Sequence, residues 1–265
     1  MSQSFEYSHD ATVKAITSFY EFMVRLHGEE AALMEYPPPT GWPQITYESF
    51  AGLGKTKEVI DLLRHIPYFV IDPCILKSTR PRDYIDSQFC EEIKKWPALE
   101  PAELDNEEGR LPGYIVSLAS AWEEQVGWTL LIDTKRGVVI LWKNDGDLPG
   151  WAWDWDADMY DVDADQYGPE GWKCMPTYRI ETFFEFRKEQ YRIMNWTPDL
   201  LRGDACQPND NDNPSEDDLR RRQIMRDAGW PGTDGDGTGW DREKAEKDLE
   251  GYEEEIRSLR RQNST

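Results

Sequence analysis

The sequence has few cysteines, the residues from which disulfide frameworks and many structural zinc sites are built. Its 265 residues include four cysteines, which lie far apart and form no C-x-x-C pair: Cys74, Cys90, Cys174 and Cys206. We therefore expect free thiols in a reducing compartment rather than a structural zinc site. We expect no cofactor.

Histidine is also scarce, with three in the chain. His9 falls in residues 1–10, which we expect to be a flexible N-terminus. His65 falls in the last turn of an expected helix, where a partly charged imidazole suits the helix dipole. The spacing of the histidines indicates no Ser–His–Asp or Cys–His arrangement. The sequence therefore predicts no catalytic residues.

Long apolar runs and an excess of basic residues are missing as well. No run approaches the ~18–20 apolar residues of a membrane span, and the first residues lack the basic and apolar regions of a secretory signal. With 52 acidic against 30 basic side chains, the net charge of −22 repels nucleic acid and anionic membranes. We expect a soluble intracellular protein, cytoplasmic or nuclear. A basic protein surface is the partner that this charge best accommodates.

Aromatic residues are abundant by contrast. The chain has 12 Trp, 12 Tyr and 9 Phe, and each ring can bury roughly 150–250 Å². Apolar positions recur every three or four residues over 11–34, 56–66 and 181–196, which is typical of helices. The aromatic content and this periodicity predict a sizeable core that helices help to cover.

Two strand-like runs stand between these helices, at 114–120 and 127–146. The second is divided by “DTKRG”, a hairpin signature in which Asp133 opens the turn and Gly137 takes a positive φ. Helices first, a β-meander next and a closing helix indicate an α+β fold. We predict a single domain with a mixed or antiparallel sheet flanked by helices, followed by an acidic, partly disordered tail.

The tail begins after Arg202, where the composition changes. “GDACQPNDNDNPSEDD” is polar and rich in breakers, as a disordered linker would be. A short helix is expected to stop at Gly229-Trp230-Pro231. The charged helix after it has a thin apolar stripe and needs a surface to lie on. We expect residues 203–265 to be an acidic linker and a C-terminal charged helix, both dispensable for folding.

Gly54-Lys55-Thr56 matches the end of a phosphate-binding loop, G-x-x-x-x-G-K-[ST]. The first required glycine falls on Ser49, however, and the residues before it lack the buried strand that delivers such a loop. We interpret Gly54 instead as entering a helix that begins at Lys55 or Thr56. A strand ending near Ser49 would favour a phosphate loop, and a turn or helix there would favour our interpretation.

A second motif lies in “WAWDWDADMYDVDADQYG”, residues 151–168. Asp154, Asp156, Asp158 and Asp165 occupy relative positions 1, 3, 5 and 12 of a calcium loop, but Met159 stands where position 6 requires glycine. A further acidic loop at 234–245 has Ala where the last acid should be. These aspartates are incomplete candidates for metal ligands, and solvated loops are the expectation.

Tryptophans alternate with the acids of 150–168, which suits this segment to a protein partner. Charge would speed the encounter with a basic partner, and desolvated Trp anchors would hold the complex. The predicted partner-binding residues are Trp151, Trp153, Asp154, Trp155, Asp156, Asp158, Asp161 and Asp163. The alternative is that the Trp rings cover the sheet.

The order of features from residue 41 to 196 resembles the SUKH superfamily, which includes the yeast regulators of cell-wall synthesis and bacterial immunity proteins. The resemblance is carried by Trp42-Pro43 with “FAGLGKTKEVIDLLRHIPY”, by “YIVSLAS”, by “GWTLLIDTKRGVVILW” and by “TFFEFRKEQY”. It implies one α+β domain over 11–202, with insertions at 71–112 and 144–176, that binds proteins without catalysis.

The function that these features predict is a non-enzymatic protein-interaction module, a regulatory or immunity-type adaptor. Two alternatives come from the motifs. One is a nucleotide-binding or hydrolysing enzyme with a degenerate phosphate loop at Gly54–Thr56, and the other is a divalent-cation-binding protein that uses the Asp-rich loop. The sequence indicates no oligomeric state.

The incomplete phosphate loop leads to a first prediction. Calorimetric titration of the full-length protein with Mg²⁺–ATP or Mg²⁺–GTP should show no specific binding, because a required glycine and the delivering strand are missing. Saturable binding that Lys55→Ala abolishes would overturn this interpretation.

Overall fold

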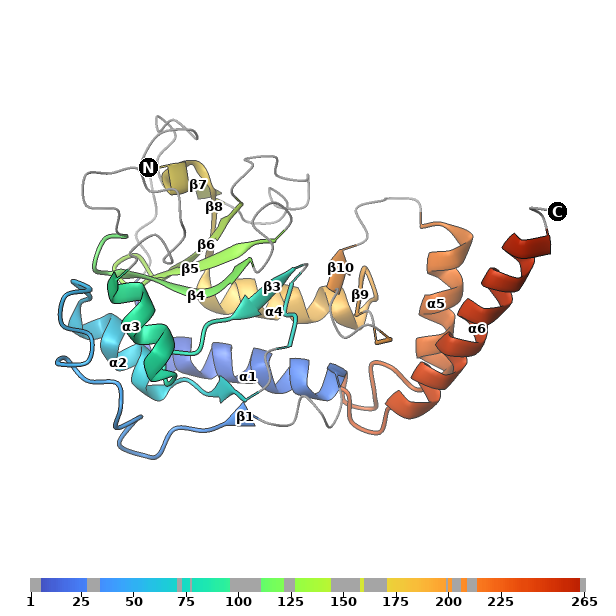
Figure 1. Ribbon diagram of the computed structural model, residues 1–265, viewed down its shortest axis with the longest axis horizontal. Helices are drawn as coiled ribbons and strands as arrows, with labels where there is room; N and C mark the ends of the chain where they lie inside the picture. Colours follow the sequence, from blue (N-terminus) through green and yellow to red (C-terminus); the bar gives the residue numbers. More distant parts are fainter. Residues whose placement is uncertain are drawn as a thin grey trace.

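Helices and an antiparallel sheet make up the part of the chain that the computed structural model describes (Figure 1). The described residues are 6–27, 34–70, 73–76, 78–95, 111–121, 127–143, 158–159, 171–198, 200–201, 206–208 and 214–262. The α-helices are α1 (His9–His27), α2 (Lys57–His65), α3 (Ser87–Lys95), α4 (Ile180–Arg192), α5 (Glu216–Asp227) and α6 (Arg242–Gln262). The predicted α+β class is confirmed.

Six strands form the main sheet in the order β3-β4-β5-β6-β8-β7, and neighbouring strands are antiparallel. Their bounds are β3 (Thr79–Pro81), β4 (Ile115–Ala121), β5 (Thr129–Asp133), β6 (Val138–Trp142), β8 (Pro176–Arg179) and β7 (Asp158–Met159). Two smaller ribbons pair β1 (Met34–Glu35) with β2 (Tyr68–Phe69) and β9 (Trp196–Pro198) with β10 (Cys206–Pro208).

The predicted hairpin is confirmed, since β5 pairs with β6 along its whole length. Asp133 opens the turn as expected. Its Oδ1 accepts hydrogen bonds from the backbone N–H groups of Lys135 (2.8 Å) and Arg136 (3.0 Å). Gly137 completes the turn with a φ of +68°, a conformation that glycine adopts without a steric penalty.

Alternation along the central strands divides their side chains between two hydrophobic clusters. The cluster on the helical side contains Val116, Leu118, Leu130, Ile132, Val139 and Leu141. The cluster on the other side contains Leu111, Ile115, Leu131, Val138, Ile140, Trp142, Trp172 and Met175. Trp172 belongs to the 3-10 helix η4 (Gly171–Cys174). Both sides of β5 and β6 are buried, which explains why β6 is apolar throughout and why Leu130, Leu131 and Ile132 form the middle of β5.

Helices α1 and α4 lie side by side on one face of the sheet (Figure 1). Phe19 of α1 and Phe184 of α4 meet with ring centroids 5.3 Å apart. None of the helices in the described ranges combines the length and the apolar character that a membrane crossing requires. Both α1 and α4 contribute residues to the main hydrophobic cluster.

Arg187 of α4 is fully buried among aromatic rings. Its guanidinium carbon lies 4.6 Å from the ring centroids of Phe183 and Trp196, 5.3 Å from Phe186 and 5.8 Å from Tyr178. Burial lowers the pKa of Arg187 to about 10, so the side chain remains a cation at neutral pH. Attraction between the cation and the ring faces helps to hold α4 against β8 and β9.

Several elements in the region expected as an insertion at 71–112 were missed by the sequence pattern. The edge strand β3 has the sequence Thr-Arg-Pro and carries no apolar alternation, and α3 is nine residues long. β8 was missed as well, because it is four residues long and leads directly into α4. Short strands such as β3 and β8 are defined by the strands with which they pair rather than by their own sequence.

The expectation that His9 lies in a flexible terminus is wrong. Helix α1 begins at His9, two residues before the predicted start. Ser8 supports this beginning, since its side-chain oxygen accepts a hydrogen bond from the Ala11 N–H (3.4 Å) and its carbonyl accepts one from the Thr12 N–H (3.0 Å). Ser8 before Asp10 was the sequence signal for a helix start.

Part of the chain after Arg202 docks on the core, a contact that the expected linker and charged helix did not include. Trp230 is only 3% exposed and belongs to the main hydrophobic cluster. Its ring lies 5.6 Å from that of Phe22, and its Nε1–H donates to the Tyr191 carbonyl (2.9 Å). Trp240 packs edge-on against Trp230. The composition of this segment did not indicate the docking, because the segment is mostly polar and the rings that pack on the core are those of Trp230 and Trp240.

Trp230→Ala should lower the free energy of unfolding by about 3–5 kcal/mol, because the substitution leaves a large cavity and removes a buried hydrogen bond. Urea denaturation measures the change. Leu259→Ala, at a half-exposed position of α6, is the control and should change stability by less than about 0.5 kcal/mol. Equal effects of the two substitutions would show that the C-terminal segment is not part of the core.

Candidate functional site

Helices α5 and α6 form a helical hairpin, here called the arm, that projects from the body of the protein (Figure 1). At its base, five buried residues form a separate cluster: Leu200, Ile224, Ala228, Ala245 and Leu249. Further out, Arg221 of α5 reaches Asp217 (3.0 Å) and Glu253 of α6 (3.4 Å). The two helices are thus joined by an apolar base and an ion-pair network above it.

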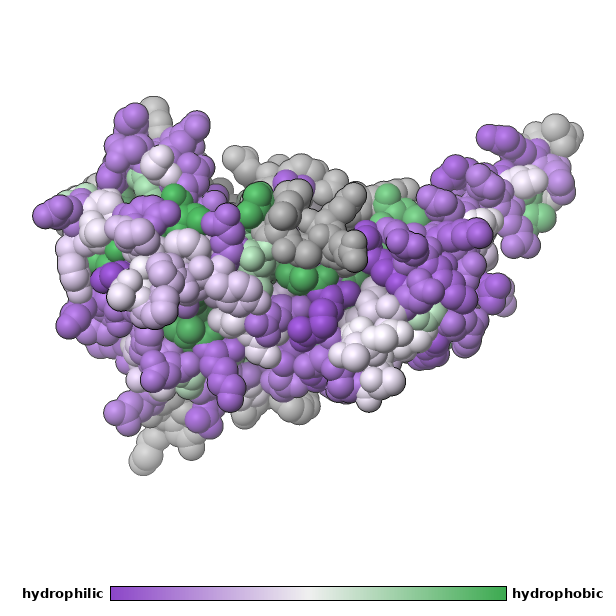
Figure 2. Space-filling view, turned by 90° about the horizontal axis from the view of Figure 1, so that it is seen from below, coloured by the Kyte–Doolittle hydropathy of each residue, from purple (hydrophilic) through white to green (hydrophobic). Residues whose placement is uncertain are grey.

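The apolar side chains of α6 follow a coiled-coil spacing of four, three, four and three residues: Ala245, Leu249, Tyr252, Ile256 and Leu259. Packing on α5 buries Ala245 and Leu249. Leu259, two turns beyond Tyr252, is 52% exposed, and Leu219 at the start of α5 is 50% exposed. Figure 2 shows hydrophobic atoms among hydrophilic ones near the end of the arm. We call Tyr252, Ile256 and Leu259 the distal seam.

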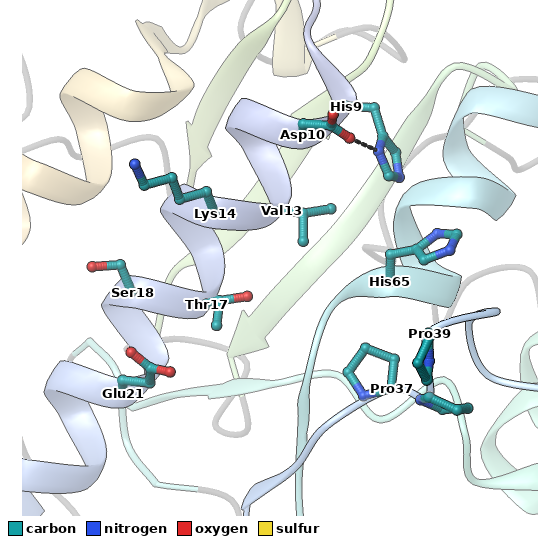
Figure 3. A pocket seen from close by; sticks show the side chains of 11 residues that line it. His9, Asp10, Val13, Lys14, Thr17, Ser18, Glu21, Pro37, Pro39 and His65 are labelled. Carbon is teal, nitrogen blue, oxygen red and sulfur yellow. Dashed lines mark hydrogen bonds and ion pairs between the residues drawn. The ribbon is translucent and has the colours of Figure 1, made fainter.

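An open pocket of about 610 Å³ lies at the other end of the molecule, between α1, the proline segment 37–39 and the end of α2. Val13 and Thr17 point toward the pocket from α1, with the prolines opposite (Figure 3). His9 and His65 line its upper end in this view. Val13 and the prolines give the pocket apolar surface, and polar or charged side chains line the rest of it beside the two imidazoles: Asp10, Lys14, Thr17, Ser18 and Glu21.

Three potential metal ligands meet beside this pocket. His9, Asp61 and His65 each offer one ligand atom, and these atoms lie within 4.8 Å of one another. Spacing along the sequence did not bring them together: Asp61 and His65 are one turn apart on α2, but His9 comes from the start of α1. The i,i+4 pair was visible in the sequence, and the third member depends on how the two helices pack.

Gly54-Lys55-Thr56 leads into a helix rather than forming a phosphate loop, but the helix begins one or two residues later than predicted. Ser49 lies in a turn, and residues 36–56 contain no strand. The Lys55 ammonium donates to the Ile115 carbonyl (2.8 Å), and the Thr56 N–H donates to the Gly113 carbonyl (2.9 Å). The segment therefore joins α2 to the start of β4. Helix α2 itself begins at Lys57, after Thr56.

Most of the predicted partner-binding segment lies outside the described residues. This applies to Trp151, Trp153, Asp154, Trp155, Asp156, Asp161, Asp163 and the metal-ligand candidate Asp165. Asp158 is described at the level of the backbone, where it begins β7 and pairs with Thr177 of β8. Residues 158 and 159 thus form a strand at one edge of the main sheet.

The second acidic loop is engaged by the protein itself. Asp234 accepts hydrogen bonds from the N–H groups of Asp236 (2.8 Å) and Thr238 (3.1 Å) and from the Thr238 hydroxyl. These bonds, led by that of the hydroxyl, lower the pKa of Asp234 to about 2. Asp236 forms ion pairs with Arg192 of α4 and Arg25 of α1. The loop fastens the base of the arm to the core.

Comparison with family models, with curated proteins and with solved structures found no match to this chain.

The third histidine, His27, is buried at the end of α1. Desolvation, reinforced by the positive charge of Arg242 on α6, lowers the pKa of His27 to about 4, and a hydrogen bond to the Cys74 carbonyl opposes this effect. The folded protein therefore holds His27 neutral at pH values at which the unfolded chain, with an ordinary pKa near 6.5, binds a proton. Burial of His27 thus links stability to pH.

His27→Gln should remove this linkage. Below pH 6.5 the unfolded state takes up the proton first, so the His27 contribution to stability is complete above pH 6.5 and is lost as the pH falls toward 4. The difference in unfolding free energy between wild type and variant should change by about 2–3 kcal/mol between pH 7 and pH 4. Urea denaturation across this range tests it, and a constant difference would contradict it.

Proposed function

We propose that this protein is a non-enzymatic, intracellular interaction module that binds a protein partner through the distal seam of its arm. The occupant that suits the seam is an amphipathic helix with basic flanks. Helices recognise one another through apolar residues at heptad spacing. The expected role is regulatory or of the immunity-adaptor type.

Continuity of the apolar stripe supports this proposal most directly. The stripe that packs α6 on α5 continues beyond Glu253, which pairs with Arg221 of α5, and its final leucine is half-exposed. Docking of Trp230 and the pairing of Asp236 with Arg192 and Arg25 hold the base of the arm in place. A seam presented on a fixed base suits recognition, because less conformational freedom is lost on binding.

Charge favours a basic partner over an acidic one. The net charge of the chain is −22. On α6, Glu250, Glu254 and Glu255 lie beside the first part of the seam, and Arg257, Arg260 and Arg261 lie beside Leu259. The acidic, Trp-rich segment 150–168 is proposed as a second contact surface for the same partner. Opposite charges would steer the encounter, and apolar contacts at the seam would then hold the complex.

Membership of the SUKH superfamily is part of the same proposal. The hairpin of β5 and β6 and the later helix α4 stand in the order that the resemblance implies. Nucleotide binding is the less favoured alternative, because Lys55 of the Gly-Lys-Thr segment donates to the Ile115 carbonyl and Ser49 lies in a turn.

Affinity purification from the native host, followed by quantitative mass spectrometry, tests the seam with two matched variants. Leu259→Asp places a charge in the seam, whereas Ser258→Asp adds the same charge at the neighbouring exposed position. A partner captured by the wild type should bind Leu259→Asp at least about 10-fold more weakly in a direct titration, as expected when an apolar anchor is lost. Ser258→Asp should bind like wild type.

Two outcomes would contradict the proposal. If no captured protein distinguishes Leu259→Asp from Ser258→Asp, the seam is not a binding surface. If light scattering instead shows a dimer that Leu259→Asp dissociates, the occupant is a second copy of this chain. Changing Asp154, Asp156 and Asp158 together to Asn tests the second surface, and a slower on-rate with a flatter salt dependence is expected.

A further inference from the structure

We propose that His9, Asp61 and His65 form a binding site for a transition-metal dication of the zinc type. Two imidazoles and a carboxylate are ligands that suit Zn²⁺, Co²⁺ or Ni²⁺. The site is separate from the arm and does not depend on the proposed function.

Distances within the cluster suit a shared ion better than direct hydrogen bonds. His9 Nε2 lies 3.6 Å from Asp61 Oδ2, and His65 Nδ1 lies 3.6 Å from Asp61 Oδ1. Both distances exceed those of normal hydrogen bonds. Bonds of about 2.0–2.2 Å to a tetrahedral ion would place neighbouring ligand atoms roughly 3.3–3.6 Å apart. Each carboxylate oxygen therefore stands at a metal-compatible distance from one ring, Oδ2 from His9 and Oδ1 from His65.

A second carboxylate orients the first imidazole. Asp10 Oδ1 lies 2.9 Å from His9 Nδ1, which places the ring proton on Nδ1 and leaves the lone pair of Nε2 directed toward Asp61. Metal-binding histidines commonly have such a carboxylate on their other nitrogen. Asp10 is thus a positioning residue for the site.

The His9 and His65 rings must move slightly before both can bind one ion, and their partial exposure allows this movement. The rings of His9 and His65 meet edge-to-face with centroids 5.1 Å apart, and both side chains are partly exposed. His65 Nδ1 also contacts the Asp61 carbonyl (2.8 Å). On binding, the ion replaces this hydrogen bond, and the proton of the neutral ring moves to Nε2.

The place of this cluster, between two helices and beside the pocket, has two consequences for an ion bound there. The ion would join the start of α1 to the last turns of α2, so it should stabilise the folded state in proportion to its affinity. His9 and His65 also line the 610 Å³ pocket, so an exchangeable fourth ligand has access from that side (Figure 3). The three protein ligands leave at least one coordination position for it.

Equilibrium dialysis and calorimetry of the full-length, metal-stripped protein with Zn²⁺ test the site. Wild type should bind one saturable equivalent, and its melting temperature should rise by about 3 °C or more at saturation. Asp61→Asn and His65→Ala should each lose at least about 10-fold in affinity. Co²⁺ should give the visible absorption of a nitrogen- and oxygen-ligated ion in wild type and not in Asp61→Asn.

Two further variants separate the cluster from general attraction to an acidic chain. Glu58→Gln removes the same charge from the first turn of the same helix and should bind like wild type. Asp10→Asn should keep the Co²⁺ spectrum but weaken binding by about 10-fold or more. Metal-free melting curves establish that each variant is folded, and His9→Gln provides a conservative replacement if His65→Ala is not.

Absence of a saturable equivalent in wild type would overturn the proposal. Equal weakening by Glu58→Gln and Asp61→Asn would also overturn it, because the ion would then be held by diffuse negative charge rather than by three ligands.

Discussion

The packing of α1 against α4 and the sheet is the constraint on which both candidate sites depend. The middle of α1 is fixed by rings such as Phe19, which meets Phe184 of α4. Its first residue, His9, is thereby brought opposite Asp61 and His65 of α2. Its last turn supplies Arg25, which pairs with Asp236 at the base of the arm. One buried helix therefore places the proposed metal ligands at one end of the domain and the arm at the other.

Local patterns in the sequence were sufficient to predict the longer helices and the central hairpin. The spacing of apolar residues predicted α1, α2 and α4, and the “DTKRG” signature predicted the turn between β5 and β6 with Asp133 in the role it has. Such elements carry their own signal because one face is buried along several turns or because a turn needs particular residues. The α+β class followed from their order.

Contacts between distant segments were the part that the sequence did not predict. Trp230 lies in a polar stretch whose composition indicates a linker, yet its ring enters the core beside Phe22. His9 and His65 are separated by more than fifty residues and meet through helix packing alone. Gly54-Lys55-Thr56 is a case in which a short motif pointed to a function that the fold does not support. Its contacts join α2 to the start of β4. Composition and short motifs report local preferences, and neither reports which surfaces meet.

Arg187 has a consequence for how this sequence can vary. A buried guanidinium is tolerated here because ring faces surround it, among them those of Phe183 and Trp196. Lysine has a compact and strongly hydrated charge that does not stack in the same way, and a neutral residue would leave the rings around a void. Changes at any one of these positions are thus disfavoured unless the others change with it. The arginine and its rings therefore form one packing unit, in which a substitution at one member alters the surroundings of all the others.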